Sequence, residues 1–143
     1  MNKHLKSKIC QSFNLSTLIS EEPPPTLRSR INFLREIFIL CPPPEEPKAY
    51  LLSNYPKNPE WIELNEAMLV GNSSETQLRL QDPTVSRKHC LIEKCNEWWV
   101  LKDLGSANGV YVNGDKIVEK RLNHGDVIQT GVSMLVFIDN NIE

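Results

Sequence analysis

Short apolar runs separated by turn residues fill the sequence after Lys48, and they constrain its fold more than any other feature. Strands spaced in this way, with no long helix between them, predict an all-β antiparallel sandwich or barrel. The clearest hairpin has Asn113-Gly114 between Val110–Val112 and Lys116–Ile117, because a type I′ turn needs positive φ at both central positions. We expect strands at residues 49–52, 61–64, 68–70, 89–92, 98–101, 110–112, 127–130 and 134–138.

The first 47 residues differ in character from this strand pattern. Prolines cluster at 23–25 and 42–47, and the segment between them carries four apolar residues at helical spacing: Leu27, Ile31, Leu34 and Phe38. We expect a helix over 27–40 with Thr26 at its N-cap, inside a partly disordered extension over 1–47, followed by a domain over 48–140. The apolar stripe of this helix would pack on the domain or pair with another copy of the chain.

Composition narrows the classes of partner. With 16 basic and 18 acidic residues the formal net charge is −2, which gives no general attraction to nucleic acid or anionic membranes. The apolar runs are far shorter than the ~20 residues that a membrane span needs. The four cysteines lack the C-x-x-C spacing of metal or redox sites, so we expect free buried thiols and a cytoplasmic protein: Cys10, Cys41, Cys90 and Cys95.

Three motifs occur in a fixed order after residue 84: Val85-Ser86-Arg87-Lys88-His89, then Asp103 to Gly109, then Leu122 to Ile128. Together with Val70-Gly71 and Tyr111 to Gly114, they resemble the signature of the forkhead-associated (FHA) domain family over about 48–138. The resemblance implies a two-sheet β-sandwich with loops at one end that bind an extended phosphothreonine peptide. It therefore implies a signalling module that binds other proteins.

The resemblance also implies roles for single residues. Ser86 matches the serine that donates to a phosphate oxygen, Arg87 the neighbour that adds a second contact, and Asn108 the amide that pairs with the peptide backbone. Ser106, in the loop of Asn108, joins this binding set. Four residues would support the loops: Gly71, His89, Gly109 and Asn113. At Gly71 we expect a tight turn. From the residues alone, Ser86 could instead bond its own loop backbone. Asn108 and Asn113 could be turn formers, and Arg87 and Lys88 solvated surface charges.

One position departs from the family pattern. The arginine that usually follows the glycine at 71 and clamps the phosphate is replaced by Asn72. Two explanations stay open. Arg79, Arg87 or Lys88 could supply the charge, so that Asn72 and Arg79 belong to the phosphopeptide site. Alternatively, the chain is a degenerate FHA scaffold that binds partners independently of phosphate.

The remaining patterns favour a regulatory role over catalysis. There is no activated nucleophile, metal-ligand spacing or phosphate-cradling glycine loop, so we expect no enzyme, cofactor or metal.

The run Pro23-Pro24-Pro25 presents Thr26 in an extended form, which makes Thr26 a candidate phosphosite for an upstream Ser/Thr kinase. Its own domain or that of a neighbour in a dimer would bind it. A fused or partner output enzyme, such as a nucleotide cyclase, would be regulated.

Trp98 and Trp99 alternate along a strand, so we expect one in the core and the other exposed.

Overall fold

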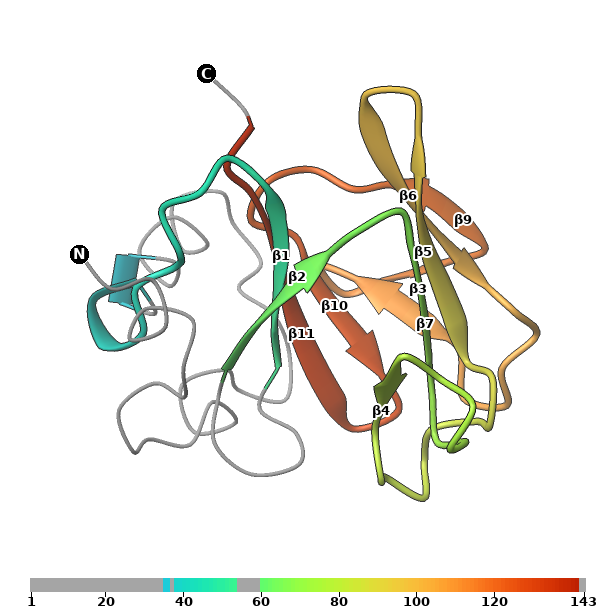
Figure 1. The fold of residues 1–143 in the computed structure, drawn as a ribbon. Helices are drawn as coiled ribbons and strands as arrows, with labels where there is room; N and C mark the ends of the chain where they lie inside the picture. Colours follow the sequence, from blue (N-terminus) through green and yellow to red (C-terminus); the bar gives the residue numbers. More distant parts are fainter. Residues whose placement is uncertain (1–34, 37, 54–59, 142–143) are drawn as a thin grey trace.

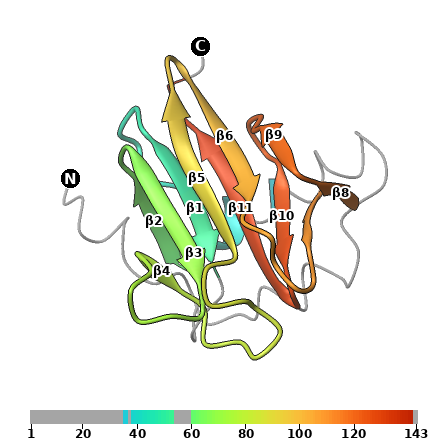
Figure 2. The same cartoon turned by 90° about the vertical axis from the view of Figure 1, so that its right-hand side faces the viewer.

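The chain folds into two β-sheets packed face to face (Figures 1 and 2), which confirms the prediction of a β-sandwich. The computed structural model describes residues 35–36, 38–53 and 60–141. Of the helix expected over 27–40, residues 35, 36 and 38–40 are helical, and the others lie outside the described residues. All eight expected strands are present, whereas the short strands at 78–79 and 119–121 were not expected.

The first sheet has six strands in the order β2-β1-β11-β10-β7-β8, all antiparallel to their neighbours. Their bounds are β1 Ala49–Ser53, β2 Glu60–Leu64, β7 Val110–Val112, β8 Asp115–Ile117, β10 Val127–Thr130 and β11 Ser133–Asp139. The β7–β8 turn has φ of 52° at Asn113 and 91° at Gly114, which confirms the predicted two-residue hairpin.

The second sheet has five strands in the order β4-β3-β5-β6-β9. Their bounds are β3 Ala67–Gly71, β4 Leu78–Arg79, β5 Cys90–Cys95, β6 Trp98–Asp103 and β9 Glu119–Arg121. Only β4 is parallel to its neighbour β3, pairing Gly71 with Arg79, and the other pairs are antiparallel. Figure 2 shows this sheet in front of the six-stranded one.

The core lies between the sheets and follows the alternation of side chains along the strands. Leu51, Leu135 and Phe137 enter it from the six-stranded sheet, and Ile92 and Leu101 from the five-stranded sheet. Trp99 is buried there, whereas Trp98 is 39% exposed beneath the guanidinium of Arg121, 4.3 Å from the ring centre. The expectation of one core and one exposed tryptophan is thus confirmed.

The six-stranded sheet has a second apolar surface on the side away from this core, which we call the outer apolar face. It consists of Tyr50, Leu52, Trp61, Val127, Met134, Val136 and Ile138. Phe38 and Cys41, from the segment before β1, pack against it. Both faces of β1 and β11 are therefore buried.

Of the cysteines that the structure describes, one differs from expectation, and Cys10 lies outside the described residues. Cys90 and Cys95 are free, and burial raises the pKa of the Cys90 thiol to about 12. Cys41, in contrast, takes part in a disulfide, so the expectation of four free thiols is wrong for this residue. No helix among the described residues is long and apolar enough to cross a membrane.

Candidate functional site

Three loops carry the residues that the sequence singled out: β3–β4 (72–77), β4–β5 (80–89) and β6–β7 (104–109). The β3–β4 and β4–β5 loops lie at one end of the sandwich, at the bottom of Figure 1. The β6–β7 loop meets them there, since the Ala107 amide donates to Ser86 Oγ over 3.0 Å. Side chains from three separate segments thus converge on one surface.

Ser86 is fixed by three hydrogen bonds that leave its hydroxyl proton available. Its amide donates to His89 Nδ1 over 2.9 Å, and its carbonyl accepts from the Asn72 amide over 2.9 Å. Its Oγ accepts from Ala107, so the hydroxyl hydrogen can still be donated to a ligand. A half-buried serine held in this way is pre-oriented as a donor for an anionic oxygen.

His89 connects two of the loops from beneath. The ring is fully buried, and its Nδ1 accepts from the Ser86 amide. The ring hydrogen therefore sits on Nε2, which donates to the Gly109 carbonyl over 2.8 Å. The imidazole thus connects Ser86 to the end of the β6–β7 loop, and it does not reach the surface.

Asn108 lies on the exposed surface beside this serine loop. Its Nδ2 donates to the Thr84 carbonyl over 2.7 Å. That bond uses one of the two amide N–H groups, so the second N–H and the carbonyl oxygen remain for a peptide backbone. A fixed amide that both donates and accepts is suited to an extended ligand.

Asn72 acts as a brace and not as a free amide. Its Nδ2 donates to the Asp82 carbonyl over 3.1 Å, which ties the β3–β4 loop to the β4–β5 loop. Arg79 lies against the same residue, with Nε donating to the Asn72 carbonyl over 3.4 Å. The position that usually holds the clamp arginine is thus occupied by a structural contact, and an exposed guanidinium lies next to it.

Exposed cations lie on the same loops: Arg87 and Lys88 follow Ser86 directly in the chain, and Arg79 contacts the Asn72 carbonyl. Arg79, Arg87 and Lys88 are all exposed, and none of them forms a salt bridge with another described residue. Among the described residues these charges have no ion-pair partner, so they are a local source of positive potential on a chain whose net charge is negative.

Gly71 is required by a close approach and not by the tight turn that the sequence suggested. It is the last residue of β3, and a Cβ at this position would lie 2.1 Å from the Arg87 carbonyl oxygen. Its neighbours Asn72 and Ser73 donate to the Ser86 and Arg87 carbonyls. The β4–β5 loop is therefore laid directly against the end of β3.

Ser106 and Asn113 are not part of the exposed set. The Ser106 amide donates to Asp103 Oδ1, while its hydroxyl is buried without a partner among the described residues. Asn113 holds the β7–β8 turn to the next strand through Asp126 and the Val127 amide, over 3.0 Å each. Of the predicted set, the structure brings together Ser86, Asn72, Arg79, Arg87 and Asn108.

Asp82 and Thr84 form a node that sequence reasoning missed. Asp82 Oδ1 accepts from the amide and the hydroxyl of Thr84 over 2.9 and 2.6 Å, and Oδ2 accepts from Ser133 Oγ over 2.7 Å. Thr84 Oγ1 accepts in turn from the Val132 amide over 2.9 Å. Burial raises the pKa of the Asp82 carboxyl, but hydrogen bonds from Thr84 and Ser133 outweigh this and hold the pKa below its usual range.

This node connects to the candidate site through Asn108 and to the β10–β11 turn through Val132. The Thr84 carbonyl accepts a hydrogen bond from Asn108, and the Thr84 hydroxyl oxygen accepts one from Val132 in the β10–β11 turn. In the sequence, Asp82-Pro83-Thr84 is a pattern typical of an Asx turn, and that was the available signal.

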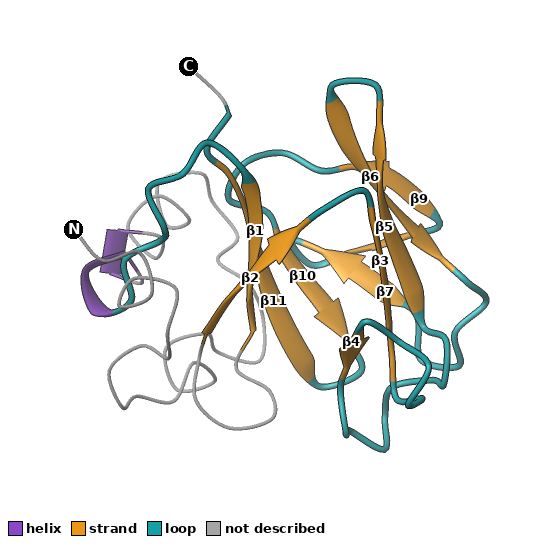
Figure 3. Ribbon diagram, viewed as in Figure 1, coloured by secondary structure: helices purple, strands orange, loops and turns teal. Residues whose placement is uncertain are grey.

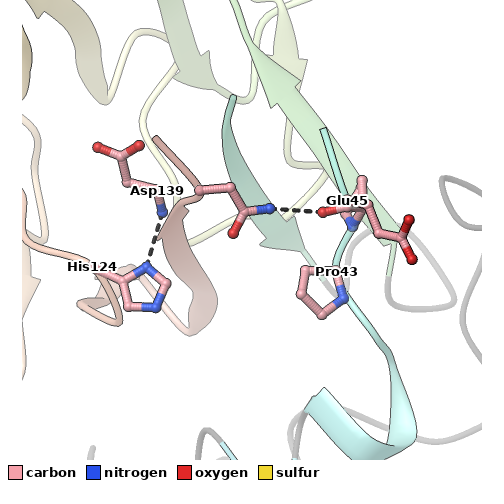
Figure 4. A pocket seen from close by; sticks show the side chains of 6 residues that line it. Pro43, Glu45, His124 and Asp139 are labelled. Atoms are coloured by element: carbon pink, nitrogen blue, oxygen red, sulfur yellow. Dashed lines mark hydrogen bonds between the residues drawn. The ribbon is translucent and has the colours of Figure 1, made fainter. Parts of the chain in front are cut away.

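A second concave region lies at the opposite end of the six-stranded sheet, where the segment before β1 meets the end of β11 (Figure 4). This open cleft of about 580 Å³ is lined by Pro43, Pro44, Glu45, His124, Asp139 and Asn140. His124 Nδ1 accepts from the Asp139 amide over 3.1 Å, and Asn140 Nδ2 donates to the Pro44 carbonyl over 2.7 Å. The described residues contain no group of three or more His, Cys, Asp or Glu side chains that could hold a metal ion.

A two-sheet sandwich that presents a serine, an amide and unpaired cations on loops at one end defines a class of loop-based binding modules. The family model described as FHA domain matches residues 68–131. A solved structure from a study of phosphothreonine-dependent FHA domain interactions is 32% identical, with a TM-score of 0.59, and the match covers 64% of this chain and 95% of that one. The chain belongs to the FHA domain family.

Curated relatives match over shorter parts. The oxoglutarate dehydrogenase inhibitor of Corynebacterium jeikeium is 35% identical over 78 residues, covering 54% of each chain. The glycogen accumulation regulator GarA of Mycobacterium tuberculosis is 37% identical over 68 residues, covering 48% of this chain and 42% of GarA. The chain thus spans about half the length of these relatives.

Proposed function

We propose that this chain is a non-catalytic module that binds phosphothreonine-containing proteins through the three loops. The observation that carries the proposal is the state of Ser86: its Oγ accepts from Ala107, while its hydrogen is directed to no described residue. The exposed Arg87 follows it in the chain, and the exposed Arg79 contacts the neighbouring Asn72 carbonyl. A phosphate would take the serine hydrogen bond and the charge-assisted bonds together. One compared structure comes from a study of phosphothreonine-dependent FHA interactions, which supports this choice of ligand.

Arg79 is the residue that we propose as the substitute for the clamp arginine. It pairs across from Gly71 in the parallel β3–β4 ladder, and its guanidinium contacts the Asn72 carbonyl. The side chain therefore starts one strand away from the usual position and reaches the same loop. Arg87 would add a second charge from the other side of Ser86.

The partner that we propose is a phosphorylated protein segment, with Thr26 of this chain or of a neighbouring copy as one candidate. An upstream Ser/Thr kinase would write the signal, and the bound state would regulate a partner or fused output enzyme in the cytoplasm, for which a nucleotide cyclase is one example. Two relatives carry regulatory names, as an oxoglutarate dehydrogenase inhibitor and a glycogen accumulation regulator, which supports regulation of metabolic enzymes as the output.

A phosphate-independent scaffold is the second candidate, and one observation favours it. The Asn72 amide is used to hold the Asp82 carbonyl, so this position offers no cationic clamp. In that case the same loops would bind unmodified segments through Asn108 and the exposed backbone.

Calorimetry separates the phosphothreonine-binding module from the phosphate-independent scaffold. The ligands are peptides covering Ile19 to Arg30, phosphorylated and unphosphorylated at Thr26, and a degenerate phosphothreonine library. Because hydrogen bonds to charged groups contribute ~1.5–3 kcal/mol, we expect Ser86→Ala and Arg79→Ala each to lower the affinity for phosphopeptide about 10- to 100-fold. Arg121→Ala is the matched control, since Arg121 stacks on Trp98 away from the loops. Binding that is equal with and without phosphate would favour the scaffold.

A further inference from the structure

The outer apolar face is unusual for the outside of a sandwich, where polar side chains normally alternate with the core residues. Its seven members are at most 7% exposed, although they point away from the second sheet. The strand registers place Trp61, Leu52, Val136 and Val127 in one row across β2, β1, β11 and β10. A continuous apolar row over four strands needs a cover of similar length.

The described residues show where that cover begins. The Phe38 ring packs on Trp61, with 6.4 Å between ring centres and a 52° tilt. Trp61 Nε1 donates to the Cys41 carbonyl over 3.2 Å, and Cys41 is fully buried. Figure 3 shows the helical residues before Cys41 on the side of the six-stranded sheet that faces away from the other sheet. The C-terminal end of the helix is thus anchored at the β2 edge of the row.

The connection from this helix to β1 is also fixed to the sandwich. The Asn140 side chain donates to the Pro44 carbonyl over 2.7 Å, and its backbone N–H donates to the Lys48 carbonyl over 3.0 Å. Tyr50 Oη donates to the Glu46 carbonyl over 3.3 Å. The segment before β1 therefore leaves little freedom for the helix end to move away from Trp61.

The length and the periodicity of the helical segment match the row. Phe38 is the last member of the stripe that includes Leu34, Ile31 and Leu27, and the eleven steps from Leu27 to Phe38 would span about 16 Å in a helix. Four neighbouring strands span about 14 Å. Ile39, which lies off this stripe, is 72% exposed, so of these two described residues the member of the stripe, Phe38, is the one that faces the sheet.

We propose that the outer apolar face is the docking surface for the chain's own segment Leu27–Leu40. Leu34, Ile31 and Leu27 would continue from Phe38 across β1, β11 and β10. The folded unit would then begin before residue 48, so the first 47 residues would include part of the domain. This inference does not depend on the peptide-binding function, because the face and the loops are separate surfaces.

Replacing either of two isoleucines in the helical segment with glutamate tests the docking. Ile31→Glu places a charge on the stripe, whereas Ile39→Glu places it on the exposed side of the same helix. Because proteolysis samples the open state, tryptic cleavage after Arg30 and Arg35 of the full chain should accelerate about tenfold or more in Ile31→Glu. It should remain at the wild-type rate in Ile39→Glu.

Hydrogen exchange on the wild-type chain gives an answer that needs no variant. Docking predicts slow exchange of the amides of residues 31–34, and exchange as fast as in the isolated 19–41 peptide would overturn it. Sedimentation in the same buffer tests whether a second copy of the chain covers the face instead. A wild-type dimer that Ile31→Glu converts to a monomer would show that a second copy covers the face, and would also overturn the proposal.

Discussion

At the scale of single residues, the site depends on side chains that fix one another before any ligand arrives. Ser86 is held by His89, Asn72 and Ala107, and Asn108 is held by Thr84. If these groups bind a peptide, as we propose, they would lose little conformational entropy on binding, which favours affinity over a small surface. The family arginine is missing, and its position has been turned into one of these internal contacts.

Asp82 gives a prediction with a defined sign. The pKa of its carboxyl is lower in the folded chain than the usual 3.8, so the folded state binds fewer protons than the unfolded state near that pH. Its contribution to the free energy of unfolding is therefore present above about pH 4 and is lost as the pH falls through the lowered value. Urea unfolding between pH 3 and 6 should show this loss in wild type.

The Asp82→Asn variant is the matched test of that prediction. It keeps the size of the side chain but removes the titrating group, so we expect about 1–3 kcal/mol less stability at pH 6 and a smaller decrease toward pH 3. A decrease equal to that of wild type would show that other carboxylates cause the acid sensitivity.

At the scale of elements, the β4–β5 loop is built against the end of β3, and Gly71 is where they touch. A methyl group there would lie 2.1 Å from the Arg87 carbonyl oxygen, so Gly71→Ala must displace the backbone that carries Ser86. We expect a loss of about 1–3 kcal/mol in the free energy of unfolding and a loss of phosphopeptide binding measured by calorimetry.

Gly114→Ala is the control for this element. Gly114 has φ of 91° and open space around it, so an alanine there is strained by about 1–2 kcal/mol but lies in the β7–β8 turn. If both variants lost stability to the same degree and both retained peptide binding, the contact at Gly71 would have no role in positioning Ser86.

The sequence predicted the elements better than the contacts between them. The eight expected strands and the Asn113-Gly114 hairpin follow from local alternation and turn chemistry, which are readable in a single chain. Strands β4 and β9 have two and three residues, too few to show a period, and β9 lacks the adjoining hairpin turn that marks the equally short β7. The use of Asn72 as a brace and the Asp82–Thr84 node depend on contacts between separate loops, and no local pattern specifies these.

At the scale of the whole molecule, the loops and the outer apolar face are different surfaces of one sandwich, and Thr26 belongs to the segment that we propose to dock on the face. If the helix docks as we propose, Leu27 would be held on the face, and Thr26 would have no free linker with which to reach the loops of its own domain. A phosphate at Thr26 would also interact favourably with the N-terminus of the helix, which stabilises docking. The preceding prolines would remain available to a neighbouring molecule.

Self-recognition of phosphorylated Thr26 should therefore occur between molecules. We expect the full chain phosphorylated at Thr26 to associate as its concentration rises in sedimentation experiments, and Ser86→Ala in the same phosphorylated chain to remain monomeric. The unphosphorylated chain, which keeps the same helix and loops, is the control. A chain that stays monomeric at every concentration yet no longer binds added phosphopeptide would show capture within one molecule, and would require the helix to leave the sheet when Thr26 is modified.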